Sequence, residues 1–123
     1  MDRLWLALGA AYGFLGVALG AFGAHALKEK LAPEMLAAWR TGVEYQFYHA
    51  LALILLALLM RGSANIWQQY AGGCFAAGTL LFSGSLYALA LSGVRALGAV
   101  TPLGGLLFLA GWACLLISAA KAP

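Results

Sequence analysis

The feature that most constrains this chain is its four long apolar stretches, none of which carries a charge in its middle. They cover approximately residues 4–27, 43–60, 70–91 and 100–120. About 20 mostly apolar residues cross the hydrocarbon core of a bilayer as an α-helix, because backbone polar groups there must bond within the segment. The stretches are too long and too uniform for the alternating strands of a membrane barrel. We therefore predict an all-α membrane protein, a single domain of four transmembrane helices packed as a bundle.

The composition excludes other classes of protein. Apolar residues make up 64% of the chain and charged residues 9%, against about 45–50% and about 25% in soluble domains. Disordered chains are likewise poor in apolar residues. The seven Lys and Arg residues are dispersed, so no basic run could follow a phosphate backbone and we expect no nucleic-acid partner. Cys74 and Cys114 lack a CxxC or Cys/His spacing, and we interpret them as small apolar side chains in helix packing, with a disulfide or a metal site as the minor alternatives.

The first span also has features of a secretion signal. Arg3 precedes an apolar run that ends in the small-residue sequence Ala24-His25-Ala26. The run exceeds 20 residues, however, whereas the apolar core of a signal peptide is about 7–15 residues long. We therefore expect this span to be retained as a membrane helix.

The segment before the second span has a helical pattern of its own. Pro33 and Glu34 suit the first turn of a helix, and Leu36, Trp39 and Val43 recur at helical spacing. A short interfacial helix would explain this pattern. A water-side extension of the second span, continuous from Pro33 to Met60, would explain it equally, and we favour the extension because only Gly42 interrupts it.

The positive charges divide almost evenly between the two sides of the membrane. Arg3, Arg61 and Lys121 share the side of the amino terminus, and four other residues lie on the opposite side: Lys28, Lys30, Arg40 and Arg95. The difference of three against four positive charges is too small for the positive-inside rule to determine the orientation. We expect both termini in the cytoplasm.

Glycines recur along one face of the first span, in steps of 4, 3, 4 and 3 residues: Gly9, Gly13, Gly16, Gly20 and Gly23. Small residues allow membrane helices to approach closely. We predict a tight helix–helix contact, with a partner helix in the same chain or in a second copy; the alternative is a groove for a lipid tail or a flat ring.

The segment Leu51–Met60 of the second span has no polar face, and we expect lipid around much of its surface.

Most hydrogen-bonding side chains of the spans fall in one leaflet. Because the first two spans are joined as a hairpin, the start of the second span lies close to the end of the first. Glu44, near the start of the second span, is the most informative single residue. The candidate polar cluster consists of His25, Arg40, Glu44, Tyr48, His49, Ser83 and Ser85. Ionisable groups are expensive in a membrane and call for a functional hypothesis. The cluster is either an interfacial network that fixes helix ends or a site for proton transfer or ligand binding.

The sequence has no clear motif for metal binding, nucleophilic catalysis or nucleotide binding. His25, His49 and Glu44 are suitable ligands for zinc or iron, but nothing in their spacing demands a metal. Ser83-Gly84-Ser85 is not a nucleophile elbow, and the sequence has neither a phosphate loop nor a dinucleotide fingerprint. We predict no catalytic residue, no metal and no cofactor, and lean against an enzyme.

Five short words, spread over all four spans, carry a resemblance to a known family: GAFGAH (20–25), TGVEYQFYH (41–49), FSGSLY (82–87), TPLGG (101–105) and FLAGW (108–112). In this respect the chain resembles the small integral membrane proteins of the domain-of-unknown-function 423, or transmembrane-protein-256-like, family. The resemblance implies a multi-pass protein of the bacterial inner membrane. Because no activity is established for that family, it implies no chemistry.

The function we expect is non-enzymatic. The chain is interpreted as a helix-packing structural or interaction component that sits in membrane lipid as a homo-oligomer or with a partner membrane protein. One alternative is a transport or proton-linked role through the one-leaflet polar cluster. Another is lipid or quinone binding in an apolar slot from Gly13 to Gly23 that ends at His25.

Overall fold

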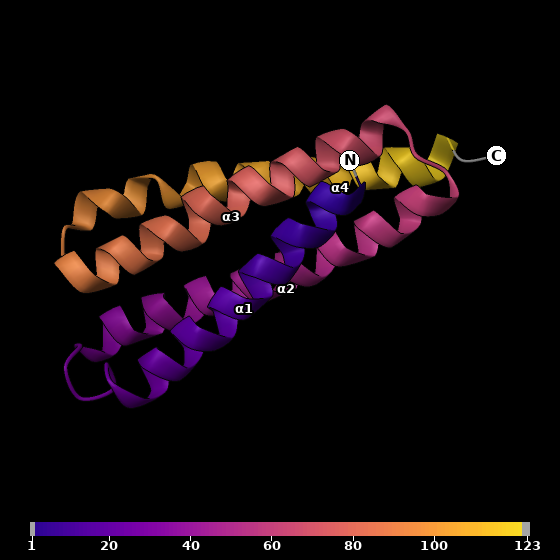
Figure 1. Cartoon of the computed structure of the whole chain (residues 1–123). Helices are drawn as coiled ribbons and strands as arrows, with labels where there is room; N and C mark the ends of the chain where they lie inside the picture. Colours follow the sequence, from indigo (N-terminus) through magenta and orange to yellow (C-terminus); the bar gives the residue numbers. More distant parts are fainter. Residues whose placement is uncertain (1, 122–123) are drawn as a thin grey trace.

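The computed structural model describes residues 2–121, which form four α-helices joined by short connections. The helices are α1 (Asp2–His25), α2 (Pro33–Gly62), α3 (Ile66–Ser92) and α4 (Thr101–Lys121), and a 3-10 helix, η1 (Arg95–Ala99), precedes α4. The α2–α3 turn lies at the same end of the molecule as the start of α1 and the end of α4, while the other two connections lie at the opposite end (Figure 1). The predicted all-α fold is confirmed.

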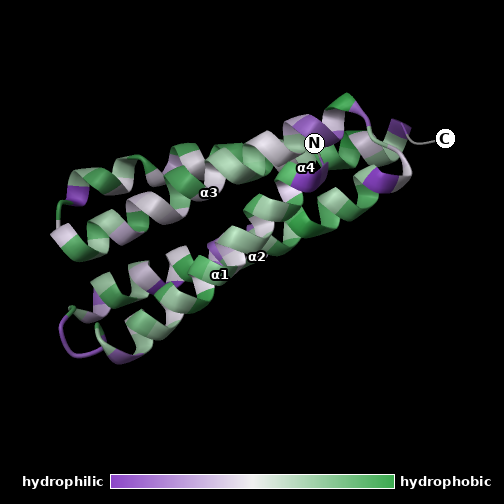
Figure 2. Ribbon diagram, viewed as in Figure 1, coloured by the Kyte–Doolittle hydropathy of each residue, from purple (hydrophilic) through white to green (hydrophobic). Residues whose placement is uncertain are grey.

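Four helical segments are long and apolar enough to cross a membrane, counting η1 together with α4. The strongly hydrophilic residues gather mainly at the two ends of the molecule, and apolar residues dominate between them (Figure 2). This distribution is the one expected of helices that cross a bilayer.

The helix that crosses the membrane second is also the longest. α2 has 30 residues and is continuous from Pro33, which occupies its first turn. The pattern before Val43 is therefore an extension of the span and not a separate interfacial helix. At 1.5 Å per residue, α2 is about 45 Å long, so one end of it extends beyond the hydrocarbon core.

α3 begins four residues before the predicted start at Tyr70 because Asn65 caps it. The Asn65 side chain accepts a hydrogen bond from the backbone N–H of Gln68 at 3.0 Å, and the Gln68 side chain accepts one from the backbone N–H of Asn65 at 3.0 Å. This reciprocal capping box satisfies two amides at the helix start. The helix ends at Gly93, whose φ of 72° is in the left-handed region that favours glycine.

The other two spans differ from their predicted bounds by one or two residues. α1 covers 2–25 where 4–27 was predicted, and α4 covers 101–121 where 100–120 was predicted. After His25 the chain turns, and the backbone N–H of Leu27 bonds to Phe22 O at 3.2 Å. The fourth helix starts late because the residues before it are wound as η1.

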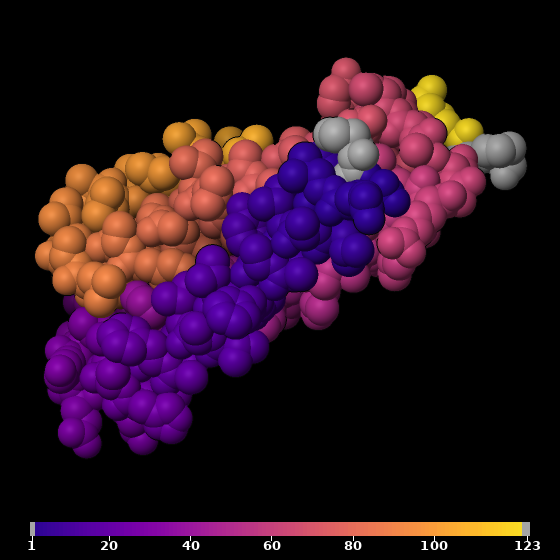
Figure 3. Space-filling view, in the orientation of Figure 1, coloured from indigo at the N-terminus to yellow at the C-terminus, as the bar shows by residue number. Residues whose placement is uncertain are grey.

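α2 packs on α1 and α3, and its His49 side chain reaches α4. Its Leu53 and Leu56 are completely buried, together with Phe75 of α3. α3 and α4 pack along each other, while α1 packs chiefly on α2. In the space-filling view the four helices form one elongated body with α1 lying across its front (Figure 3).

One expectation about lipid contact is corrected by this packing of α2. Leu51 and Leu55 are exposed, but Leu53, Leu56 and Met60 of the same segment are buried. The segment Leu51–Met60 therefore meets lipid on one side only, since other helices cover the rest of α2.

Candidate functional site

The candidate site is a network of hydrogen bonds that connects the helices inside the bundle, and Gln46 of α2 is its centre. Gln46 is 4% exposed. Its Nε2 donates to the backbone oxygen of Tyr12 at 2.8 Å, and its Oε1 accepts from the Tyr87 hydroxyl at 2.6 Å. One side chain thereby joins α1, α2 and α3.

His49 lies one turn further along α2, in an aromatic setting, and is 4% exposed. Its Nε2 accepts a hydrogen bond from Trp112 Nε1 at 3.1 Å, and its Nδ1 lies 2.8 Å from the backbone oxygen of Tyr45. The imidazole stacks on Phe108 with ring centroids 3.6 Å apart. Because an indole nitrogen can only donate, Nε2 is the acceptor, and the proton of this neutral ring is on Nδ1.

Two serines of α3, Ser83 and Ser85, bond to neighbouring helices. The Ser83 hydroxyl donates to the backbone oxygen of Gly42 in α2 at 2.7 Å, and Ser83 is 1% exposed. The Ser85 hydroxyl bonds to Phe82 O at 2.9 Å and to the hydroxyl of Thr101 in α4. These bonds are the usual role of serine in a membrane helix.

Three further bonds complete the connections between helices. The Tyr12 hydroxyl donates to Ala76 O at 2.8 Å, Trp39 Nε1 donates to Leu19 O at 2.9 Å, and Asn65 Nδ2 donates to the Ser118 hydroxyl at 2.9 Å. Within residues 2–121, Trp5 Nε1 is the one buried side-chain polar atom without a hydrogen bond. The interior is therefore almost completely satisfied.

The predicted polar cluster divides into two groups. His49, Ser83 and Ser85 are buried in the network, whereas His25, Arg40, Glu44 and Tyr48 are exposed. Arg40 and Glu44 do not form an ion pair within residues 2–121. At 100° per residue, Glu44 and Gln46 point about 160° apart around α2, so the carboxylate faces outward while the amide faces the core.

Several residues of the network lie outside the predicted cluster, among them Gln46, Tyr87, Trp39 and Trp112. Gln46 and Tyr87 carried a usable signal, because each is a hydrogen-bonding side chain inside an apolar span. Tryptophans near a membrane boundary resemble interfacial anchors in sequence, but Trp39 is 2% exposed and Trp5 is 6% exposed, whereas Trp112 is 44% exposed. Trp39 and Trp5 therefore do not face lipid.

The predicted glycine face lies mostly against α2. A Cβ at Gly9 would come within 2.8 Å of Ala50 O, and one at Gly16 within 3.0 Å of the Phe47 ring. Gly20 and Gly23 similarly face Val43 and Trp39, while a Cβ at Gly13 would meet nothing within 4 Å. The close approach is thus made within one chain.

A groove opens between α1 and α3 over the network. Its volume is about 210 Å³, and it is lined by Tyr12, Leu15, Leu19, Gln46, Thr79, Leu80, Ser83, Gly84 and Tyr87. The polar groups at its base bond within the chain. What the groove offers a ligand is therefore an apolar surface in the middle of the span, and it does not end at His25.

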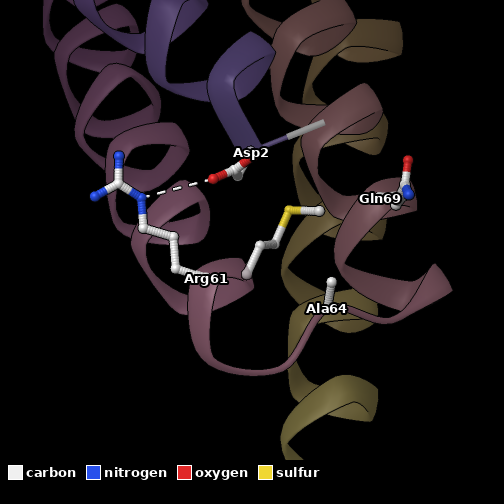
Figure 4. Close-up of a pocket in the computed structure, with 5 residues that line it drawn as sticks. Asp2, Arg61, Ala64 and Gln69 are labelled. Carbon is white, nitrogen blue, oxygen red and sulfur yellow. Dashed lines mark ion pairs between the residues drawn. The ribbon is translucent and has the colours of Figure 1, made fainter.

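Charged residues pair at the ends of the bundle. Arg61 Nε lies 3.6 Å from Asp2 Oδ2 beside an open hollow that Met60, Ala64 and Gln69 also line (Figure 4). At the other end Arg95 bonds to Glu34 at 3.0 Å, and both side chains are exposed. Exposed pairs of this kind contribute about 0–1 kcal/mol to stability.

Within residues 2–121 no group of three His, Cys, Asp or Glu residues could hold a metal ion, and Cys74 and Cys114 are free.

Comparison with known proteins identifies the family. The profile described as protein of unknown function (DUF423) matches residues 19–105. A UPF0382 membrane protein of Staphylococcus haemolyticus is 46% identical over 97% of both chains. The UPF0382 inner membrane protein YgdD of Escherichia coli K12 is 47% identical over 98% of this chain and 92% of its own. No solved structure matches.

This chain therefore belongs to the DUF423 family, and it is a multi-pass protein of the bacterial inner membrane.

Proposed function

We propose that the protein is a non-enzymatic assembly component of the inner membrane, which acts by contact with itself or with another membrane protein. The observation that carries this proposal is the saturation of its interior. Gln46 and Ser83 bond other helices with their side chains, and His49 bonds α4 through Nε2 and its own helix through Nδ1. Within residues 2–121 such an interior stabilises one arrangement of helices and leaves Trp5 Nε1 as its one unbonded polar atom.

A proton-linked role has less support. A relay needs a group that can accept and release a proton inside the bundle. His49 engages both ring nitrogens within the chain, and Glu44 faces outward. Neither residue is available to pass a proton across the core.

The outer surface has the features of a contact surface. Large apolar side chains are exposed on all four helices, as lipid requires. Arg40 and Glu44 are also exposed, and ionisable residues of a membrane span normally face a protein interior and pair with a partner. Their outward position supports an interaction with protein.

The test measures assembly and flux on the same protein. Copies labelled with donor and acceptor dyes are reconstituted into liposomes, association is followed by energy transfer as lipid dilutes the protein, and proton entry is followed with an enclosed pH dye. In parallel, chemical cross-linking in native membranes detects other partners. We expect assemblies, or adducts with a defined partner, and proton entry equal to that of protein-free liposomes. A protein that is monomeric in both settings, and whose proton flux disappears in a folded Glu44→Gln variant, would overturn the proposal.

A second candidate function, binding of a lipid or isoprenoid tail, is favoured by the groove between α1 and α3. Gly84 lines it, and a Cβ there would meet nothing within 4 Å. The variant Gly84→Leu would add an apolar side chain to this space, and circular dichroism would check that the variant is still folded. Loss of a co-purified lipid species from that variant, measured by mass spectrometry, would support tail binding.

A further inference from the structure

We infer that the outer face of α2 pairs two copies of this chain through reciprocal Arg40–Glu44 contacts. This inference rests on the proposed assembly function and names the partner. The outer face of α2 consists of Ala37, Arg40, Glu44, Tyr48, Leu51, Leu55 and Leu58, all of which are exposed.

The spacing of these residues makes one continuous surface. Their steps are 3, 4, 4, 3, 4 and 3 residues, which is the spacing of a helix–helix seam. Residues between them pack within the chain: Val43 on Gly20 and Phe47 on Gly16 of α1, and His49 on Phe108 of α4. The outer face of α2 is left open.

The depth of Glu44 argues for a partner. Val43 packs on Gly20, which is five residues before the end of α1, or about 8 Å along the helix. A carboxylate at that depth that faced lipid alone would be costly. Within residues 2–121, neither Arg40 nor Glu44 takes part in an ion pair.

Charge complementarity selects a second copy as that partner. Two copies related by a two-fold axis along the membrane normal present the same residues at the same depth. Arg40 of one copy then lies one turn, about 6 Å along the axis, from Glu44 of the other. The long guanidinium side chain can span this distance, and symmetry makes the pair twice. Tyr48 and the leucines of the outer face continue the contact into the hydrocarbon.

The test uses charge reversals in liposomes, with association measured by energy transfer between labelled copies. Arg40→Glu gives two acidic positions and Glu44→Arg two basic ones, so each variant alone repels itself. We expect each reversal to lower the association constant at least about tenfold, because facing like charges oppose pairing. Mixing the two variants creates Glu–Arg contacts in both directions, and we expect the mixture to regain most of the wild-type association.

The mixture separates a contact between copies from one within a helix. In each single variant the charges at positions 40 and 44 repel within the chain, and mixing cannot relieve that repulsion. Lys30→Glu, a reversal in the exposed loop, is the matched control and should associate like the wild type. Circular dichroism checks that every variant is helical, and the mixture itself tests folding, since misfolded variants would not recover.

Two results would overturn the inference: single reversals that associate like the wild type, or a mixture that fails to recover. If cross-linking in native membranes nevertheless shows a defined complex, the proposed function stands and only this pairing fails. If the wild type is monomeric in liposomes and in native membranes, both fail.

Discussion

Trp112 of α4 donates its indole N–H to Nε2 of His49 in α2, over 3.1 Å. The bond determines the state of the histidine, because the acceptor nitrogen has no proton and Nδ1 donates to Tyr45 O. α4 is therefore bonded to α2 through a neutral imidazole.

Replacement of Trp112 by phenylalanine tests this bond. The aromatic surface is largely kept, but Nε2 of His49 loses its donor inside the bundle. Hydrogen bonds between membrane helices contribute about 0.6 kcal/mol on average and up to about 1.7, so we expect the free energy of unfolding to fall by about 1 kcal/mol. Unfolding by SDS in mixed micelles, followed by circular dichroism, measures it.

A double-mutant cycle with His49→Phe isolates the pair from lost packing. The two substitutions together should be less harmful than the sum of their separate effects, since one bond can be lost only once. Strict additivity would mean that the two side chains do not interact in the folded protein.

The glycine face of α1 gives a matched pair of variants on one helix. Gly9→Ala places a methyl group within 2.8 Å of Ala50 O and of Ile54 Cγ1. Overpacking against a backbone atom typically costs about 1–3 kcal/mol. Gly13→Ala meets nothing within 4 Å and should not lower stability. Equal unfolding free energies for the two variants would contradict the observed packing of α1 on α2.

Asn65 both caps α3 and bonds to Ser118 of α4. We expect Asn65→Ala to lower the free energy of unfolding by about 0.5–2 kcal/mol, the usual cost of losing a cap. Asn65→Asp keeps the oxygen that accepts from Gln68 and should retain most of the stability. An alanine variant as stable as the aspartate variant would show that the cap contributes nothing.

The orientation predicted from the sequence places both termini in the cytoplasm. In a Cys74→Ala/Cys114→Ala background, a membrane-impermeant maleimide should label Lys28→Cys in intact spheroplasts. It should label Ser63→Cys only after the membrane is permeabilised, because the α2–α3 turn lies at the end opposite the Lys28 loop. The reverse pattern would place both termini outside.

The helices were predictable because hydrocarbon imposes a simple rule of length and polarity. The capping box at Asn65 was also readable in principle, since the sequence Asn65-x-x-Gln68 is typical of a helix start. Both predictions depend on local sequence alone and do not require the packing of one helix on another.

The sequence does not show in the same way which side chains point into the bundle and which point to lipid. In a soluble protein the polar side of a helix points to water, but here both the core and the surrounding lipid are apolar. Leu53 and Leu55 are therefore equivalent in sequence, although one is completely buried and the other is 52% exposed. Glu44 was expected to join His49 for this reason, and only the helical angle separates them.

The packing of α1 almost entirely on α2 has a consequence for biosynthesis. The first helix to leave the ribosome can therefore pack on the next one before residues 66–121 are made. The amino-terminal hairpin can therefore close early in translation, and the bonds from Tyr12 to Ala76 and from Tyr87 to Gln46 lock it to the carboxy-terminal hairpin once synthesis ends.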